Sequence, residues 1–452
     1  MRFELNKEFL DSLQEAIQNK NESLVKEMVL ELHPADIADI LEELEPDDVH
    51  YLLALLPSEL TADTIVELEE DDREQLLKDI PGQEIAHAVI EHMDSDDAAD
   101  VILELPEEKQ DEILSSLSDI EQAGDIVDLL NYAPDTAGGL MATELICVNI
   151  NLTVRACVEE IRKQAPEVDE FFYVYVTDNQ GVLKGVLPLK GLLLANDDEP
   201  IKNIIEDITS VVTDDDCEEV ANIMRKYDMV SIPVVDPIGR LKGRITIDDV
   251  VDVIKEEADE DYQIMSGITG DVDSTDSVFK LTKARIPWLL IGLAGGILGS
   301  LVISGFDCQL IQHPEMAFFI PMIAAMGGNV AIQSSSIIVQ GLANDSLGFD
   351  SAGRKIIKEI LGALINGMIV ASLAIVYNIA VGQSFALSAA VSISLITVVI
   401  FASVVGTALP LGFDKVKIDP AVATGPFITT INDIMGMVIY FCIGKLCYSV
   451  FI

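Results

Sequence analysis

The chain has 452 residues, with 77 acidic residues against 28 lysines and arginines, and half of its residues are hydrophobic. A net charge of −49 excludes a nucleic-acid-binding protein, which needs a basic face to neutralise phosphates. Residues 1–280 hold 69 acids and 20 bases, whereas residues 281–452 hold eight of each. The chain therefore divides into an acidic N-terminal part and a neutral, apolar C-terminal part.

Residues 1–133 are predicted to be helical, because apolar residues recur at helical spacing and proline with acidic residues begins each segment. The segment DIADILEEL at 36–44 returns as DAADVILEL at 97–105, which predicts a small superhelix of helical repeats. Residues 1–140 hold 39 acids and only seven bases. So much like charge opposes compaction unless cations screen it.

Residues 134–261 change to short β-branched runs that alternate with helical stretches. The segment 176–185 matches 234–243, so that a strand, a glycine turn, a strand and a helix occur twice. This is the pattern of paired CBS modules, α/β domains that commonly sense nucleotides or ions. The second copy carries Thr246 and Asp249 in a Thr-x-x-Asp segment similar to the one with which such modules hold a ribose. The first copy lacks the acid, so ATP or another adenine nucleotide is left open as a ligand at one site.

The segment that follows is strongly acidic and helical. Asp249, Asp252, Glu256 and Glu260 fall on one face of a helix, where like charges one turn apart repel each other. A divalent cation shared with another acidic surface would remove this penalty. A plain solvated helix is the alternative interpretation.

The C-terminal part contains stretches that are long and apolar enough to span a membrane. Their ranges are roughly 287–306, 317–343, 359–381, 386–411 and 421–452. If the acidic part is cytoplasmic, the loops 344–358 and 412–420 also lie inside, and they carry lysine and arginine, whereas 307–316 and 382–385 carry neither. This distribution follows the positive-inside rule and predicts a multi-pass cell-membrane protein with its C-terminus outside.

Two features of the predicted spans suggest an ion site. Asp433 lies within the fifth span, where a carboxylate is costly and usually functional, and Asn329 and Gln333 share a face of the second span. Oxygen ligands without thiol or imidazole favour a hard cation such as Mg²⁺, although chemistry alone does not exclude Mn²⁺, Ca²⁺ or Co²⁺. A hydrogen-bonded structural aspartate and interhelical amide bonds are the alternatives.

The order of these parts, together with AGGLM at 137–141, PMIAAMGGNVAIQSS at 321–335 and DPAVATGPFITTINDIMG at 419–436, resembles the MgtE family of magnesium channels over essentially the whole chain. The resemblance implies a homodimer in the lipid bilayer with a pore on its two-fold axis. In that pore Asp433 would bind hydrated Mg²⁺ and Asn329 would line the path. Ala331 stands where the usual motif has glycine, so the resemblance does not determine the width of the pore at this position.

The resemblance also implies a connecting plug helix over 262–284 and a pore domain over 285–452. It further implies cytoplasmic Mg²⁺-sensing carboxylates at matching positions. These are Asp96, Asp100, Asp216, Glu218, Asp249, Asp252, Glu257, Glu260, Asp261 and Asp419.

The sequence thus predicts an all-α superhelical N-terminal domain, α/β tandem CBS modules and a five-helix transmembrane bundle. The expected function is a Mg²⁺-selective channel that imports magnesium and that cytoplasmic Mg²⁺ closes. One alternative is a secondary transporter in which Asp433 carries a proton or exchanges Na⁺ for a divalent cation, and another is a non-conducting membrane sensor. An enzyme is not expected, because the sequence contains no recognisable nucleophile–base pair or catalytic metal cluster.

Overall fold

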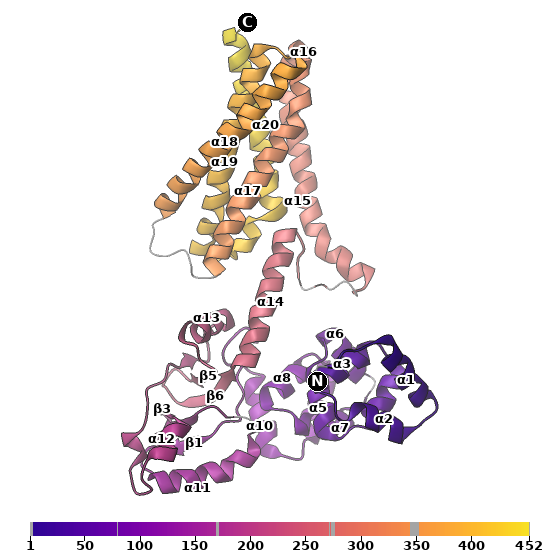
Figure 1. The fold of residues 1–452 in the computed structure, drawn as a ribbon, viewed down its shortest axis with the longest axis vertical. Coiled ribbons are helices and arrows are strands. Elements are labelled where there is room, and N and C mark those ends of the chain that lie inside the picture. Colours follow the sequence, from indigo (N-terminus) through magenta and orange to yellow (C-terminus); the bar gives the residue numbers. More distant parts are fainter. Residues whose placement is uncertain are drawn as a thin grey trace. The chain divides into compact units, whose positions relative to one another are not determined.

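The computed structural model describes residues 3–78, 80–168, 171–270, 272, 276–343 and 352–451. The chain folds into two compact units, Met1–Ile254 and Lys255–Ile452. The first contains short helices and two small sheets, and the second contains long helices (Figure 1). The predicted fold class, with a helical N-terminal domain, an α/β CBS pair and five long apolar helices, is confirmed.

The N-terminal part is a succession of short helices. Two of them, α3 and α4, begin with proline at their first position, where a missing N–H costs nothing. The repeated sequence segments form α3 and α8, each with most of its apolar residues buried, whereas Leu103 of α8 is exposed. The bounds are α1 Lys7–Gln18, α2 Glu22–Val29, α3 Pro34–Glu42, α4 Pro46–Leu53, α5 Ser58–Val66, α6 Glu70–Lys78, α7 Gly82–Ala88, α8 Ser95–Leu103, α9 Glu107–Ser116 and α10 Ile120–Leu129.

The two CBS modules have the same topology. In each, the first strand pairs parallel to the second and the second antiparallel to the third, and a register shift follows Val176 in one copy and Val234 in the other. The duplication seen in the sequence is therefore a structural duplication. The first copy has β1 Cys147–Asn149, α11 Val154–Gln164, β2 Val174–Thr177, β3 Leu183–Leu187 and α12 Leu189–Leu194. The second has β4 Val211–Val212, α13 Cys217–Tyr227, β5 Ser231–Val235, β6 Leu241–Thr246 and α14 Ile247–Ser266.

The helical N-terminal part and the second CBS module share one hydrophobic core. Leu13, Ile65 and Ile102 of the helices belong to the same buried cluster as Ile232 and Ile245 of the second sheet. The first CBS module has a separate core. The N-terminal helices thus pack directly on the second CBS module, because their apolar faces need a partner surface.

Five helices of the second unit are long and apolar enough to cross a membrane, as the sequence predicts. The most buried of them, α19, packs against α17, α18 and α20, and α20 also contacts α15. The bounds are α15 Val278–Gly305, α16 Asp307–Gln312, α17 Ile320–Ala343, α18 Ala352–Val381, α19 Phe385–Lys415 and α20 Gly425–Phe451, with 3-10 turns at Pro314–Phe319 and Pro420–Ala423.

Prolines do not divide these helices. Pro321 and Pro426 occupy the first turns of α17 and α20, where proline is well tolerated, while Pro287 and Pro410 lie inside α15 and α19. The apolar pattern predicts that Pro321, Pro410 and Pro426 interrupt three of the spans, and this prediction is wrong, because Pro321 and Pro426 lie in first turns and α19 continues through Pro410.

The segment 262–284 is not one continuous helix. Helix α14 ends at Ser266, Gly267 follows with a φ of 79°, and α15 begins at Val278, whereas residues 271 and 273–275 lie outside the described residues. Positive φ is accessible to glycine and ends the helix here. The turn is fixed to α15 by Thr269, which donates its N–H to Ala284 O at 3.1 Å and accepts a 2.7 Å hydrogen bond from the Trp288 indole.

A largely buried ion pair connects α6 to the end of α8. Arg73 donates from Nε to Glu104 at 2.8 Å, from a second guanidinium nitrogen to the same carboxylate, and from Nη1 to Val66 O at 3.1 Å. Both side chains are only 10–13% exposed. The pair Arg155–Asp197, in contrast, is 63% and 68% exposed.

Replacing Arg73 with alanine should lower the free energy of unfolding by about 3 kcal/mol or more, because Glu104 would be left buried without its partner. Arg155→Ala, the matched control, should cost less than about 1 kcal/mol because water screens an exposed pair. Thermal unfolding of the full chain followed by circular dichroism compares the two variants. Equal losses would show that burial does not strengthen the Arg73 pair.

Candidate metal centres

A carboxylate cluster lies at the first turn of α8. Asp94, the N-cap of this helix, Asp96 and Glu144 each offer an oxygen within 4.8 Å of the others. Ser95 holds Glu144 in place, since its hydroxyl and its N–H donate to Glu144 Oε2 at 2.9 and 3.3 Å. The cluster thus joins the start of a helix to a segment 48 to 50 residues later in the chain.

Further acids lie close enough to this cluster for their charges to act on its members. Burial, and then the charges of Asp97 and Asp249, raise the pKa of Asp96 well above its usual range. Burial, and then the charges of Asp94, Asp249 and Asp100, raise the pKa of Asp97 to about 7. Burial also raises the pKa of Asp249. The fold therefore brings together three of the residues expected to sense magnesium, namely Asp96, Asp100 and Asp249.

Asp249 also belongs to the segment expected to hold a nucleotide. Its Oδ2 accepts hydrogen bonds from the N–H and the hydroxyl of Thr246 at 2.9 and 2.6 Å, at the start of α14. These bonds oppose the effect of burial on the pKa of Asp249. One carboxylate is therefore the candidate for two ligands, a metal ion and a ribose.

The other expected sensor residues are not members of this carboxylate cluster. Asp216 caps α13 and accepts the Glu218 N–H at 3.0 Å, while Asp252 is exposed on α14. Glu257, Glu260 and Asp261 follow on the same helix, and Asp419 accepts the Ala421 N–H at 2.7 Å. Within the described ranges, none of these belongs to a group of three closely spaced carboxylates.

Sequence reasoning missed Asp94, Asp97 and Glu144. The run Asp94-Ser95-Asp96-Asp97 at a helix start is a local signal for an anionic first turn, which the helix dipole favours. Glu144 carries no local signal, because only tertiary packing brings it to Ser95.

The membrane candidate is built differently, from small residues on α17 and a single acid on α20. Asp433 is partly buried, and a Cβ placed on Gly328 would lie 3.7 Å from its Oδ1. The absence of a side chain at Gly328 therefore leaves room beside this carboxylate. Asn432, its neighbour, is buried and donates its amide to Ile428 O at 2.8 Å.

Asn329 and Gln333 lie on another face of α17 and are both exposed in the single chain. Ala331 is fully buried instead, and a Cβ on Gly406 of α19 would approach its carbonyl oxygen to 2.6 Å. The methyl group of Ala331 thus packs against α19 and does not lie on the face that carries Asn329.

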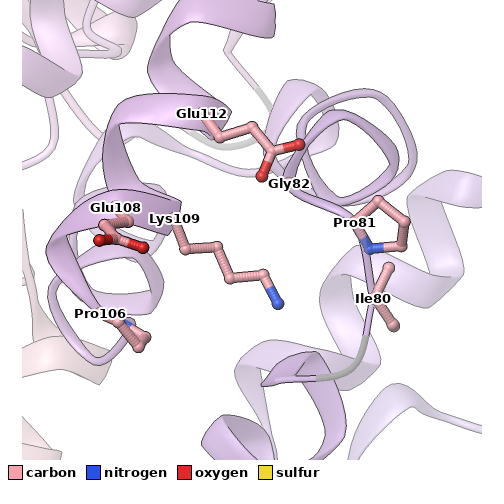
Figure 2. A pocket seen from close by; sticks show the side chains of 7 residues that line it. All are labelled: Ile80, Pro81, Gly82, Pro106, Glu108, Lys109 and Glu112. Atoms are coloured by element: carbon pink, nitrogen blue, oxygen red, sulfur yellow. The ribbon is translucent and has the colours of Figure 1, made fainter.

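A hollow in the N-terminal helices shares no residue with the carboxylate cluster. Figure 2 shows Lys109 of α9 reaching across it and Glu112 lying against Gly82. Lys109 Nζ donates to the carbonyls of Leu77 and Lys78 at 2.6 and 2.7 Å, at the end of α6. The lysine therefore caps a helix C-terminus, which indicates a structural role for this hollow.

The chain matches known protein families and relatives along most of its length. The families described as "MgtE intracellular N domain", "CBS domain" and "Divalent cation transporter" match residues 32–135, 201–256 and 320–443. The chain is 33% identical to the magnesium transporter MgtE of Thermus thermophilus, over 96% of this chain and 97% of that protein. It is 32% identical to magnesium transporter MgtE of Bacillus subtilis, over 93% of each.

Two solved structures resemble the N-terminal part. The soluble part of a magnesium transporter is 33% identical, with a TM-score of 0.51, and covers 56% of this chain and 99% of its own. The cytosolic domain of the Mg²⁺ channel MgtE in complex with ATP is 34% identical, with a TM-score of 0.51, and covers 54% and 99%.

The raised pKa values predict how stability depends on pH when metal is removed by a chelator. An acid whose folded-state pKa exceeds its unfolded-state value binds more protons when folded, so stability falls as the pH rises from about 4 to about 7. We expect the unfolding midpoint of the metal-free chain to be roughly 5 °C or more lower at pH 8 than at pH 5. Mg²⁺ should restore it at pH 8 and have little effect at pH 5, where protons occupy the carboxylates.

The variant Asp97→Asn tests this assignment. It should flatten the metal-free pH profile, whereas Asp11→Asn, at an exposed position of α1, should leave the profile unchanged. A profile that is the same for Asp97→Asn and the unmodified chain would remove Asp97 from the explanation.

Proposed function

Because the chain belongs to the MgtE family of magnesium transporters, we propose that it is a Mg²⁺-selective channel that imports Mg²⁺ across the plasma membrane and is closed by cytoplasmic Mg²⁺. The observation that carries this proposal is the pairing, in one chain, of buried like charges outside the membrane spans with Asp433, a partly buried acid inside an apolar helix bundle. The first serves as a cation gauge and the second as the ion site.

Permeation is assigned to Asp433 and Asn329. Mg²⁺ dehydrates reluctantly, so it passes with its waters, and a carboxylate beside Gly328, where no side chain stands next to it, suits such contact through water. Asn329 and Gln333 place two exposed amides in an apolar span, which is costly against lipid but favourable against a water-filled path. A second copy of the chain would enclose this face, so the proposal includes a homodimer with the pore on its two-fold axis.

Sensing is assigned to the acidic residues outside the spans. Without Mg²⁺, the carboxylates of Asp96, Asp97 and Asp249 repel one another and favour an expanded, open state. Mg²⁺ bridges them and favours the compact, closed state, because a ligand shifts an equilibrium only if it binds one state more tightly. The further sensor ligands proposed are Asp100, Asp216, Glu218, Asp252, Glu257, Glu260, Asp261 and Asp419.

ATP is proposed as a second cytoplasmic ligand. A relative's cytosolic domain was solved with ATP, and here Thr246 and Asp249 supply the Thr-x-x-Asp segment for its ribose. The charge of Asp249 also acts on Asp96 and Asp97. A ribose hydroxyl bound to the Asp249 carboxylate would therefore compete with Mg²⁺ for it. The acidic part is placed in the cytoplasm and the C-terminus outside, in accordance with the distribution of Lys and Arg between the loops.

Single-channel recording in planar bilayers tests the proposal directly. Discrete Mg²⁺ currents that disappear when Mg²⁺ is raised on the side of the acidic part are expected. Coupled uptake without such currents would instead identify a secondary transporter, and no flux of Mg²⁺, Mn²⁺ or Co²⁺ would identify a sensor.

Replacing Asp433 with asparagine should lower Mg²⁺ uptake into proteoliposomes by about tenfold or more, because the span then lacks its only carboxylate for the hydrated cation. Asp414→Asn, at an exposed position near the end of α19, is the control and should retain uptake. Normal uptake by the Asp433 variant would exclude this residue from permeation.

Neutralising Asp96 and Asp97 should have the same effect on the N-terminal unit as bound Mg²⁺. The double variant Asp96→Asn/Asp97→Asn should resist limited proteolysis of its N-terminal unit even without Mg²⁺, and added Mg²⁺ should change its cleavage rate less than about twofold. The double variant Asp11→Asn/Glu15→Gln removes the same charge from exposed sites of α1 and should keep the full response. If the first variant instead stays fully cleavable with Mg²⁺, repulsion is not what opens the domains.

A further inference from the structure

The interface between α17 and α20 is built from glycines where it passes the ion site. Gly327 and Gly328 of α17 approach Asn432 and Asp433 of α20, and Gly436 approaches Ile323. Small residues allow close approach of helices, but the contacts they make are van der Waals contacts and not directional hydrogen bonds. Because one residue of slip moves a helix by about 1.5 Å, something else must hold Gly328 level with Asp433.

A pair of hydrogen bonds at the other end of the same interface can do this. Tyr440, which lies two turns after Asp433 and therefore on the same face of α20, donates its hydroxyl to Met316 O at 3.0 Å. Both residues are fully buried. Gln309 also donates its side-chain amide to Phe441 O at 3.2 Å. Met316 precedes α17 by four residues and Gln309 belongs to α16, so these bonds join the segment that leads into α17 to α20.

Neighbouring contacts continue this attachment toward the C-terminus. Tyr448 donates its hydroxyl to Glu315 at 2.8 Å and stacks on His313 with 3.6 Å between ring centroids. Gly444 lies between the two tyrosines, one turn from each, and has Met316 packed against it. The residues Tyr440, Gly444 and Tyr448 thus form one stripe of α20 that receives the segment 313–316.

From these contacts we infer that Tyr440 is a positioning residue for the ion site: its hydroxyl bond to Met316 O sets the axial register in which Gly328 faces Asp433. The inference rests on the proposed role of Asp433 in permeation. Tyr440 does not touch the cation. It determines how much room for water lies beside the carboxylate, and hence how well a hydrated Mg²⁺ is distinguished from the larger, more readily dehydrated Ca²⁺.

The test is the full chain carrying Tyr440→Phe, which removes one hydroxyl and keeps the ring. We expect the Mg²⁺ concentration for half-maximal uptake to rise about fivefold and the ratio of Mg²⁺ to Ca²⁺ uptake to fall by a similar factor, as for the loss of one buried hydrogen bond. Tyr377→Phe, on α18 where the ring is 58% exposed, is the matched control and should change neither quantity.

The outcomes separate the inference from the function on which it rests. If Asp433→Asn loses uptake while Tyr440→Phe keeps the unmodified half-maximal concentration and cation ratio, the inference is overturned and the ion site stands. Suppose instead that Tyr440→Phe lowers the unfolding midpoint and the maximal uptake but leaves the half-maximal Mg²⁺ concentration and the Mg²⁺ to Ca²⁺ ratio unchanged. Tyr440 would then be a structural residue only, and the inference would also be overturned. Unaffected uptake by Asp433→Asn would overturn the proposed function itself.

Discussion

Like charges held close together by a hydrophobic core are the constraint on which the N-terminal unit depends. Asp96 and Asp97 begin α8, Asp249 begins α14, and the helices that carry them belong to one buried apolar cluster. Apolar burial favours the compact arrangement, while the carboxylates oppose it unless protons or cations neutralise them. In the proposed function, this opposition makes the compactness of the unit depend on cation concentration, which is the property that a sensor of Mg²⁺ requires.

The membrane unit also holds acids among apolar helices: Asp433 on α20, and Glu359 on α18, which accepts hydrogen bonds from Ser334 and Ser403. Asp433 is tolerated in an apolar bundle because glycines of α17 leave space beside it, and the same glycines make the helix contact smooth. Polar attachments such as Tyr440 to Met316 then supply the register that the glycines lack. The proposed ion site needs both a position without a side chain beside the carboxylate and a fixed frame, and we infer that these come from different turns of the two helices.

Much of this organisation could be predicted from the sequence, because it depends on local periodicity. The five spans, the repeated helical segment and the CBS duplication all appear as predicted. Some predictions that depended on single residues were wrong. Pro321 and Pro426 were expected to interrupt helices that they in fact begin, and a positive φ at Gly267 ends α14 within the stretch expected as one connecting helix. In each case the outcome depends on whether a residue falls inside a helix or at its end.

The sequence by itself determined the division into an acidic and an apolar part, the nature of the modules and the presence of an acid within a span, since composition and periodicity are properties of the chain. Only the tertiary structure decided which acids meet. Glu144 joins Asp94 and Asp96, whereas Asp216 and Asp419 each cap a local helix. The sequence does not distinguish one carboxylate from another. Their pKa values differ only when packing removes water from some of them and sets other charges beside them.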